Sequence, residues 1–250
     1  MLGFLPFLKR EWTLFYRSKM DIWFSFLPSL VTLFFFTLNM AGVVGEINGI
    51  PYEHFLLPGL AIMAITYNVS SGASRTFNER FSRMYQELFS LPATRNAYVY
   101  AKMVFITLMA LSQGILFILL GSLLFGFRLQ WNSVGLSLLV LLLCAISITS
   151  IFLCISLSIQ RMSLFLVVSN VLALALIWTS SIFYPIESMP GFLQWLSYVN
   201  PLSHGTNILR NVMLETEDDL LTSWSILAGF SIVFGVVATQ LLIKRTKIIM

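Results

Sequence analysis

Long runs of apolar residues, separated by short polar segments, dominate this chain of 250 residues. A helix needs about 20 mainly apolar residues to cross the hydrocarbon core of a bilayer. Six runs reach roughly that length, so the pattern predicts an all-α integral membrane protein, with residues 1–250 forming one transmembrane domain. The predicted spans are residues 22–44, 55–74, 99–125, 134–159, 164–184 and 224–243.

Composition excludes a water-soluble alternative. Charged residues make up 10% of the chain and hydrophobic residues 58%, whereas globular domains carry about 25% charged residues. Such a chain cannot cover a domain of this size with a polar surface. The net charge of +4 does not indicate nucleic-acid binding, because the basic residues lie in short clusters beside apolar runs, where they set topology.

The positions of lysine and arginine predict the orientation of the spans. Cytoplasmic segments of membrane proteins are enriched in both residues. With six spans and the N-terminus inside, all of the 15 basic residues except Arg128 and Arg210 fall on the cytoplasmic side. We therefore expect both termini in the cytoplasm.

Residues 2–20 precede the first span and carry their own periodic pattern. Apolar residues at Leu5, Leu8, Trp12 and Phe15 recur at helical spacing, with basic residues on the other faces. This pattern predicts an amphipathic helix lying in the cytoplasmic interface. A simple membrane anchor and a part in gating both fit it.

The connection between the second and third spans carries another helical stripe. Apolar residues recur from Phe77 to Leu88 at intervals of a helical turn, which predicts a short helix over about residues 77–90, ended by a proline. Its exposed charges suit contact with a soluble partner, and a solvated connector without a partner has the same pattern. The candidate contact residues are Arg80, Arg83, Met84, Glu87, Leu88, Pro92 and Arg95.

A long external segment lies between the fifth and sixth spans. Two apolar pieces, residues 191–199 and 202–214, flank a central Asn-Pro pair. Each piece is too short to cross a bilayer and too apolar for water, so we expect a re-entrant helical hairpin over about residues 189–214. It would cap the outer end of a pathway or act as a structural lid. The candidate cap residues are Pro190, Asn200, Pro201 and His204.

Neutral polar residues are scattered within the spans. In hydrocarbon they need hydrogen-bond partners, and contacts between helices, worth about 0.6 kcal/mol each, account for most of them. A pathway for a large amphipathic substrate would be lined by the same residue types, and the second and fifth spans hold the densest sets. The candidate lining residues are Asn68, Ser71, Asn170, Thr179 and Ser180.

The sequence lacks the common motifs of catalysis and metal binding. There is no G-x-x-x-x-G-K-S/T phosphate loop and no G-x-S-x-G nucleophile motif. Neither His54 nor His204 has a second ligand at metal-binding spacing, and the middles of the spans lack the acids of ion-coupled transporters. We expect no catalytic residue, metal or cofactor in this chain. Cys144 and Cys154 lie about 15 Å apart on one predicted helix, too far for a disulfide.

Together these segments resemble the ABC-2 type permease family, the membrane subunits of ABC exporters of drugs, lipids and polysaccharides. The resemblance covers nearly the whole chain and rests on the N-terminal helix, on YQELFSLPATRNAYVYAK and on FYPIESMPGFLQWLSYVNPLSHGTNILR. The matching positions are Glu87, Phe89, Pro92 and Arg95 in the first stretch and Pro185, Pro190, Leu193, Asn200, Pro201, Leu202 and Arg210 in the second. His204 departs from the aromatic or small residue usual in the family.

This resemblance implies a permease subunit that forms the translocation pathway as a dimer in a bacterial or archaeal inner membrane. Its partners would be a second permease and two copies of a separate ATPase subunit, which would bind ATP and Mg²⁺, and residues 77–90 would be the coupling helix. The substrate class stays open among drugs, lipids and glycans. A channel or assembly factor without an ATPase and a lipid-modifying membrane enzyme are the alternatives.

Overall fold

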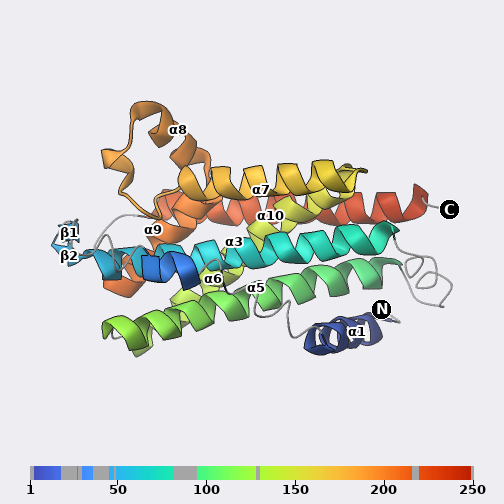
Figure 1. The fold of residues 1–250 in the computed structure, drawn as a ribbon, viewed down its shortest axis with the longest axis horizontal. Coiled ribbons are helices and arrows are strands. Elements are labelled where there is room, and N and C mark those ends of the chain that lie inside the picture. Colours follow the sequence, from blue (N-terminus) through green and yellow to red (C-terminus); the bar gives the residue numbers. More distant parts are fainter. Residues whose placement is uncertain are drawn as a thin grey trace.

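The computed structural model of the protein describes residues 3–17, 27, 30–35, 45–47, 49–81, 95–127, 130–215 and 220–248. Nearly all of them are helical, as the sequence predicts (Figure 1). The helices are α1 (Phe4–Arg17), α3 (Tyr52–Phe81), α5 (Arg95–Phe125), α6 (Trp131–Ser158), α7 (Met162–Trp178), η1 (Ile186–Ser188), α8 (Gly191–Val199), α9 (Pro201–Leu214) and α10 (Leu221–Ile248). Two short strands, β1 (Glu46–Ile47) and β2 (Ile50–Pro51), form an antiparallel pair before α3.

Four of these helices have the length and composition to cross a membrane. They are α3, α5, α6 and α10, and they lie where the second, third, fourth and sixth spans were predicted. The protein is therefore a multi-pass membrane protein. α7, in place of the predicted fifth span, is 17 residues long. Most of residues 22–44, the predicted first span, lies outside the described residues, so the count of six stays a prediction.

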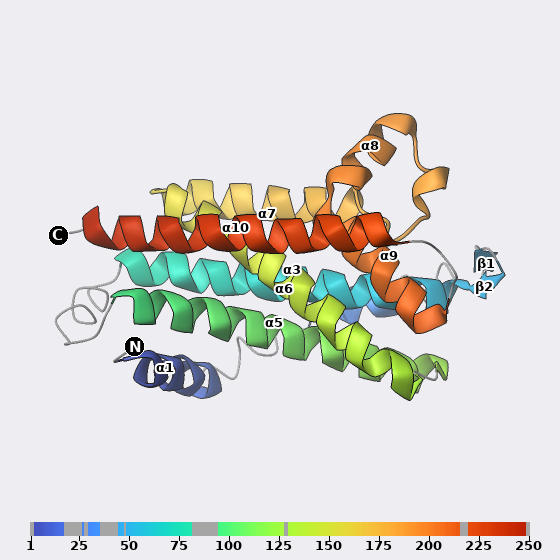
Figure 2. The ribbon, with the colours of Figure 1, turned by 180° about the vertical axis from the view of Figure 1, so that it is seen from behind.

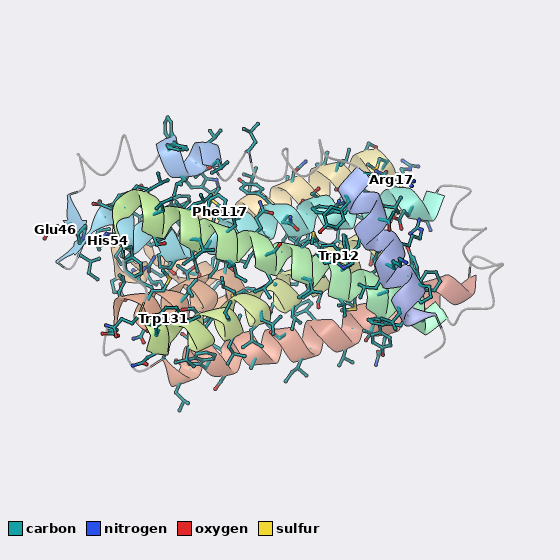
Figure 3. The ribbon with its side chains drawn as sticks, turned by 90° about the horizontal axis from the view of Figure 1, so that it is seen from below. Trp12, Arg17, Glu46, His54, Phe117 and Trp131 are labelled. Atoms are coloured by element: carbon teal, nitrogen blue, oxygen red, sulfur yellow. The ribbon has the colours of Figure 1, made fainter. Side chains whose placement is uncertain are left out.

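The long helices run side by side, and α1 lies crosswise to them at the end opposite β1 and β2 (Figures 1 and 3). Helix α3 is the central helix of the bundle. In its most apolar stretch of 18 residues, 83% is buried, whereas 22% of the corresponding stretch of α10 is buried. Leu56, Leu60 and Ile65 on α3 are among its fully buried side chains. Helix α3 packs against α5, α6, α7 and α9.

Helix α3 extends beyond the predicted second span, which was expected to end at residue 74. It continues unbroken to Phe81, so no separate helix begins at residue 77. The hydroxyl of Thr76 donates to the carbonyl of Gly72 at 3.0 Å, which satisfies the side chain within the helix. Arg and Glu are good helix formers, so a charged stretch continues the helix without strain. Residues 82–90 of the predicted coupling helix lie outside the described part.

Helix α7 ends at Trp178, before the predicted end of the fifth span at Tyr184. The hydroxyl of Thr179 donates to the carbonyl of Ala175 at 2.7 Å, and that of Ser180 donates to the carbonyl of Ile177 at 2.6 Å. The backbone of Thr179 leaves helical geometry, with φ −91° and ψ 2°. Hydropathy alone does not predict that α7 ends at Trp178.

Helices α8 and α9 occupy the segment predicted as a hairpin. Asn200 stands between them and caps α9: its Oδ1 accepts from the backbone N–H of Leu202 at 2.9 Å, and Pro201 follows at the first helical position. Both residues favour a helix start. α9 packs against α3, α6 and α10, whereas α8 stands off the side of the bundle (Figure 2). Entry of this hairpin into the bilayer stays a prediction.

Glycines let the helices approach one another closely. A Cβ atom added at Gly205 of α9 would collide with the Sγ atom of Cys144 on α6, and one added at Gly59 of α3 would lie 2.9 Å from a methyl group of Ile182. Small residues serve this purpose between helices in lipid.

Both cysteines, Cys144 and Cys154, are free thiols, as their separation along the sequence predicts.

We expect Gly205→Ala to lower the free energy of unfolding in detergent by about 1–3 kcal/mol, through overpacking. Combining it with Cys144→Ala should restore part of the loss, because the colliding sulfur is removed. Gly135→Ala on α6 is the matched control, since a methyl group there meets nothing within 4 Å. Equal thermal stability of the Gly205 and Gly135 variants would contradict this packing.

Candidate functional site

A cluster of charged side chains joins α1 to the facing ends of α3 and α5. The Nζ atom of Lys102, on α5, lies 2.8 Å from Oε2 of Glu11 on α1 and 2.8 Å from Oε1 of Glu79 on α3. Lys102 is 2% exposed and Glu11 is 6% exposed. One buried ammonium therefore holds two carboxylates that are far apart in the sequence.

Two further side chains complete this cluster. The Nη1 atom of Arg10 lies 2.8 Å from Oε1 of Glu11, and the hydroxyl of Tyr98 donates to Oε2 of Glu79 at 3.0 Å. The cluster thus contains two cations and two carboxylates. Charge balance matters here, because a buried charge without its partner is strongly destabilising.

Aromatic contacts seat α1 on α5 around the charged cluster. The ring of Phe7 meets Tyr98 edge-on at 5.6 Å, and Trp12 and Phe15 meet Phe105 at 5.7 and 6.0 Å. Figure 3 places Trp12 where α1 crosses α5. The predicted apolar stripe thus packs partly on protein.

A cavity of about 310 Å³ lies beside the cluster, between α1, α3 and α5. Glu11, Glu79 and Lys102 line it together with Phe15 and Arg75, whose guanidinium lies 5.8 Å from the ring centre of Phe15. Among the described residues, no group of three His, Cys, Asp or Glu side chains could hold a metal ion. The arrangement ties α1, α3 and α5 together.

The predicted coupling residues flank this cluster in the sequence. Arg80 belongs to α3, directly after Glu79, and Arg95 is the first residue of α5, ahead of Tyr98. The last residues of α3 and the first residues of α5, on either side of the connecting segment, are therefore close in sequence to members of the charged cluster. The remaining predicted contacts lie outside the described residues; these are Arg83, Met84, Glu87, Leu88 and Pro92.

The predicted lining residues fall in two places. Asn68, Ser71 and Asn170 lie near a hydrogen bond of 3.1 Å between the hydroxyl groups of Ser70 on α3 and Ser169 on α7. Asn68 is buried, Ser71 half-buried and Asn170 exposed. Thr179 and Ser180 instead lie at the end of α7, as described above. Their role as pathway lining stays a prediction.

The predicted cap residues tie the hairpin to the bundle. Besides capping α9, Asn200 donates through Nδ2 to the carbonyl of Leu176 at 2.6 Å and to Oγ1 of Thr179 at 3.0 Å. The Nε2 atom of His204 lies 2.8 Å from the carbonyl of Tyr198, and its Nδ1 lies 3.1 Å from the hydroxyl of Ser223 on α10. This histidine joins α8, α9 and α10.

Pro190 and Pro201 have simpler roles at helix starts. Pro190 precedes the first residue of α8 and is exposed, and its carbonyl accepts from the backbone N–H of Leu193 at 2.8 Å. Pro201 is the buried first residue of α9. Both prolines therefore define helix boundaries within the hairpin.

Comparison with known proteins places this architecture in a family. Residues 4–214 match the family model described as ABC-2 type transporter. The chain belongs to the ABC-2 type transporter family. The matched range begins with α1 and ends with α9, so both the charged cluster and the hairpin lie within the ABC-2 region.

Several relatives of this ABC-2 chain carry names that describe transport permeases. It is 26% identical over 246 residues to the inner membrane transport permease YadH of Escherichia coli strain K12, covering 94% of each chain. It is 24% identical to nodulation protein J of Sinorhizobium fredii, covering 74% of this chain and 71% of the relative. It is 27% identical to the putative transport permease ycf38 of Porphyra purpurea, covering 66% and 57%.

Sequence reasoning missed the three residues that form the centre of the charged cluster in this ABC-2 chain. Glu11 is the one acid within residues 3–17, and Lys102 stands in an otherwise apolar turn of α5. Each is an unusual charge at a helical position next to apolar residues, and that signal could have singled them out. Their pairing with Glu79 depends on the fold.

We expect Lys102→Met to destabilise this ABC-2 chain by about 3–5 kcal/mol, because Glu11 and Glu79 lose the ammonium they share and Arg10 alone is left to compensate two carboxylates. Adding Glu11→Gln and Glu79→Gln should recover most of that loss. Thermal unfolding in detergent measures both, and Lys9→Met, an exposed lysine of α1, is the control. A lone Lys102→Met change as mild as the control would refute the buried cluster.

We expect Asn200→Ala to cost about 1–3 kcal/mol, because the N-terminus of α9 loses its cap and buried acceptors lose a donor. Hydrogen exchange should rise in α8 and α9 before the rest of the bundle. Ser188→Ala, which removes an exposed hydroxyl bonded only to the carbonyl of Pro185, should leave exchange unchanged. Uniform exchange across both variants would contradict the anchoring role.

Proposed function

We propose that this chain is the permease subunit of an ATP-driven ABC exporter. It works as a dimer with two copies of a separate ATPase subunit, which bind ATP and Mg²⁺, and both of its termini lie in the cytoplasm. Its cargo is a drug, a lipid or a glycan-type molecule. Membership of the ABC-2 family and relatives named as transport permeases support this proposal.

The observation that carries the proposal is the charged cluster at the ends of α3 and α5. These two helices are joined by residues 82–94, the segment proposed to contact the ATPase. A displacement of that segment moves the ends of both helices, and the contacts of Lys102 with Glu11 and Glu79 require α1 to follow. The chain thereby converts motion of the ATPase into a rearrangement of its helices.

The external hairpin is the proposed counterpart at the other end. Asn200 and His204 hold it to α7 and α10, so a tilt of these helices carries the hairpin along. We place the outer gate of the pathway here. The candidate lining residues lie between the two ends, on α3 and α7.

The test is reconstitution with the ATPase that co-purifies with the chain. The isolated permease should hydrolyse no ATP, and cargo should stimulate the assembled complex. Glu87→Ala and Arg83→Glu should each reduce that stimulation several-fold, whereas Glu46→Ala, an exposed acid on β1, should preserve it. Stimulation unchanged in both variants would remove the segment from the mechanism, and hydrolysis by the isolated chain would refute the proposal.

A further inference from the structure

A second cavity, of about 500 Å³, lies at the opposite end of the bundle from the charged cluster. It is enclosed by the β1–β2 pair, the start of α3, η1 and α9. Glu187, Asn207, Arg210 and Asn211 supply its polar wall. Its size falls within the range of ligand-binding pockets, about 300–1,000 Å³.

Arg210 forms the base of this pocket and is only 9% exposed. Its Nε donates to the carbonyl of Phe55 at 3.1 Å and its Nη2 to that of Ser181 at 2.9 Å. The guanidinium carbon lies 3.6 Å from the ring centre of Phe55. The backbone therefore fixes the guanidinium in place.

Among the residues that the structure describes, the positive charge of Arg210 has no counter-charge in contact. Within the described ranges of the chain, Arg210 makes no ion pair within 4.0 Å. Its Nη1 atom has only a long contact, 3.4 Å, to Oδ1 of Asn207. That oxygen already accepts from the hydroxyl of Ser181 at 2.7 Å. One edge of a buried cation is thus open to a better acceptor.

Glu187 is the acid of this pocket, and it stands apart from Arg210. It is exposed, on η1, and lines the same cavity without reaching the guanidinium. The pocket therefore presents a fixed cation at its base and a separated anion at its wall. A simple anion would be attracted by one and repelled by the other, whereas a group with both charges satisfies both.

We propose that this pocket binds a zwitterionic group of the phosphoethanolamine type. A phosphate oxygen accepts from Nη1 of Arg210 and the ammonium donates to the carboxylate of Glu187. Apolar side chains at the rim, among them Ile47, Ile50 and Leu220, suit the attached glycerol or acyl part of a lipid. The shared chemistry belongs equally to a membrane phospholipid headgroup and to a soluble phosphoethanolamine compound.

The full-length protein in detergent, titrated with short-chain phosphatidylethanolamine or phosphatidylglycerol and followed by native mass spectrometry, tests this assignment. We expect the ethanolamine lipid to bind about tenfold more tightly, the effect of one charge-assisted hydrogen bond. Glu187→Gln should abolish that preference, and it is an exposed position that tolerates substitution. Glu215→Gln, an acid after α9 that does not line the pocket, should retain it.

Soluble phosphoethanolamine separates the two sources of the ligand. If soluble phosphoethanolamine displaces the bound lipid, the site recognises the headgroup alone. If the lipid binds and soluble phosphoethanolamine does not displace it, the ligand is a membrane phospholipid. Equal binding of both lipids by the unmodified protein, or a preference that survives Glu187→Gln, would overturn the proposal. None of these outcomes depends on ATP coupling, so the proposed export function stands or falls separately.

Discussion

A charged side chain among apolar helices must find its compensation inside the protein, because lipid offers neither counter-ions nor water. Lys102 meets this constraint with the carboxylates of Glu11 and Glu79, each 2.8 Å away. The solution has a structural consequence. It requires three helices to converge at one point, and it holds α1, which precedes the predicted first span, against helices that are distant in the sequence.

Pulling the charges of such a cluster apart costs much more free energy than moving the whole cluster. Separating Lys102 from both carboxylates leaves a buried ammonium uncompensated, which is strongly destabilising, while moving all three helices together leaves every contact in place. The cluster therefore resists internal separation and permits movement as a unit. Aromatic contacts of Trp12 and Phe15 with Phe105 add shape complementarity to the charge contacts. If the proposed coupling holds, α1 moves together with α3 and α5.

The sequence was sufficient for features that depend on local signals. Hydropathy located the helices, and the Asn200-Pro201 pair marked the turn between α8 and α9. Features that depend on side-chain partners were missed: the bond from Lys102 to Glu11 spans 91 residues, and no local pattern encodes it. The end of α7 was missed as well, because the sequence stays largely apolar beyond Trp178, where the helix stops.

The two ends of the bundle solve the same electrostatic problem in different ways, and the difference separates their roles. Lys102 is neutralised by carboxylates, so its cluster is closed and has no charge left for a ligand. Arg210 is held by carbonyl dipoles, which orient the guanidinium without cancelling its charge, and no described carboxylate, Glu187 included, forms an ion pair with it within 4.0 Å. A site that keeps a fixed, uncancelled charge beside a cavity is suited to recognition. The choice of partner thus agrees with the two proposals, a mechanical connection at one end of the bundle and ligand contact at the other.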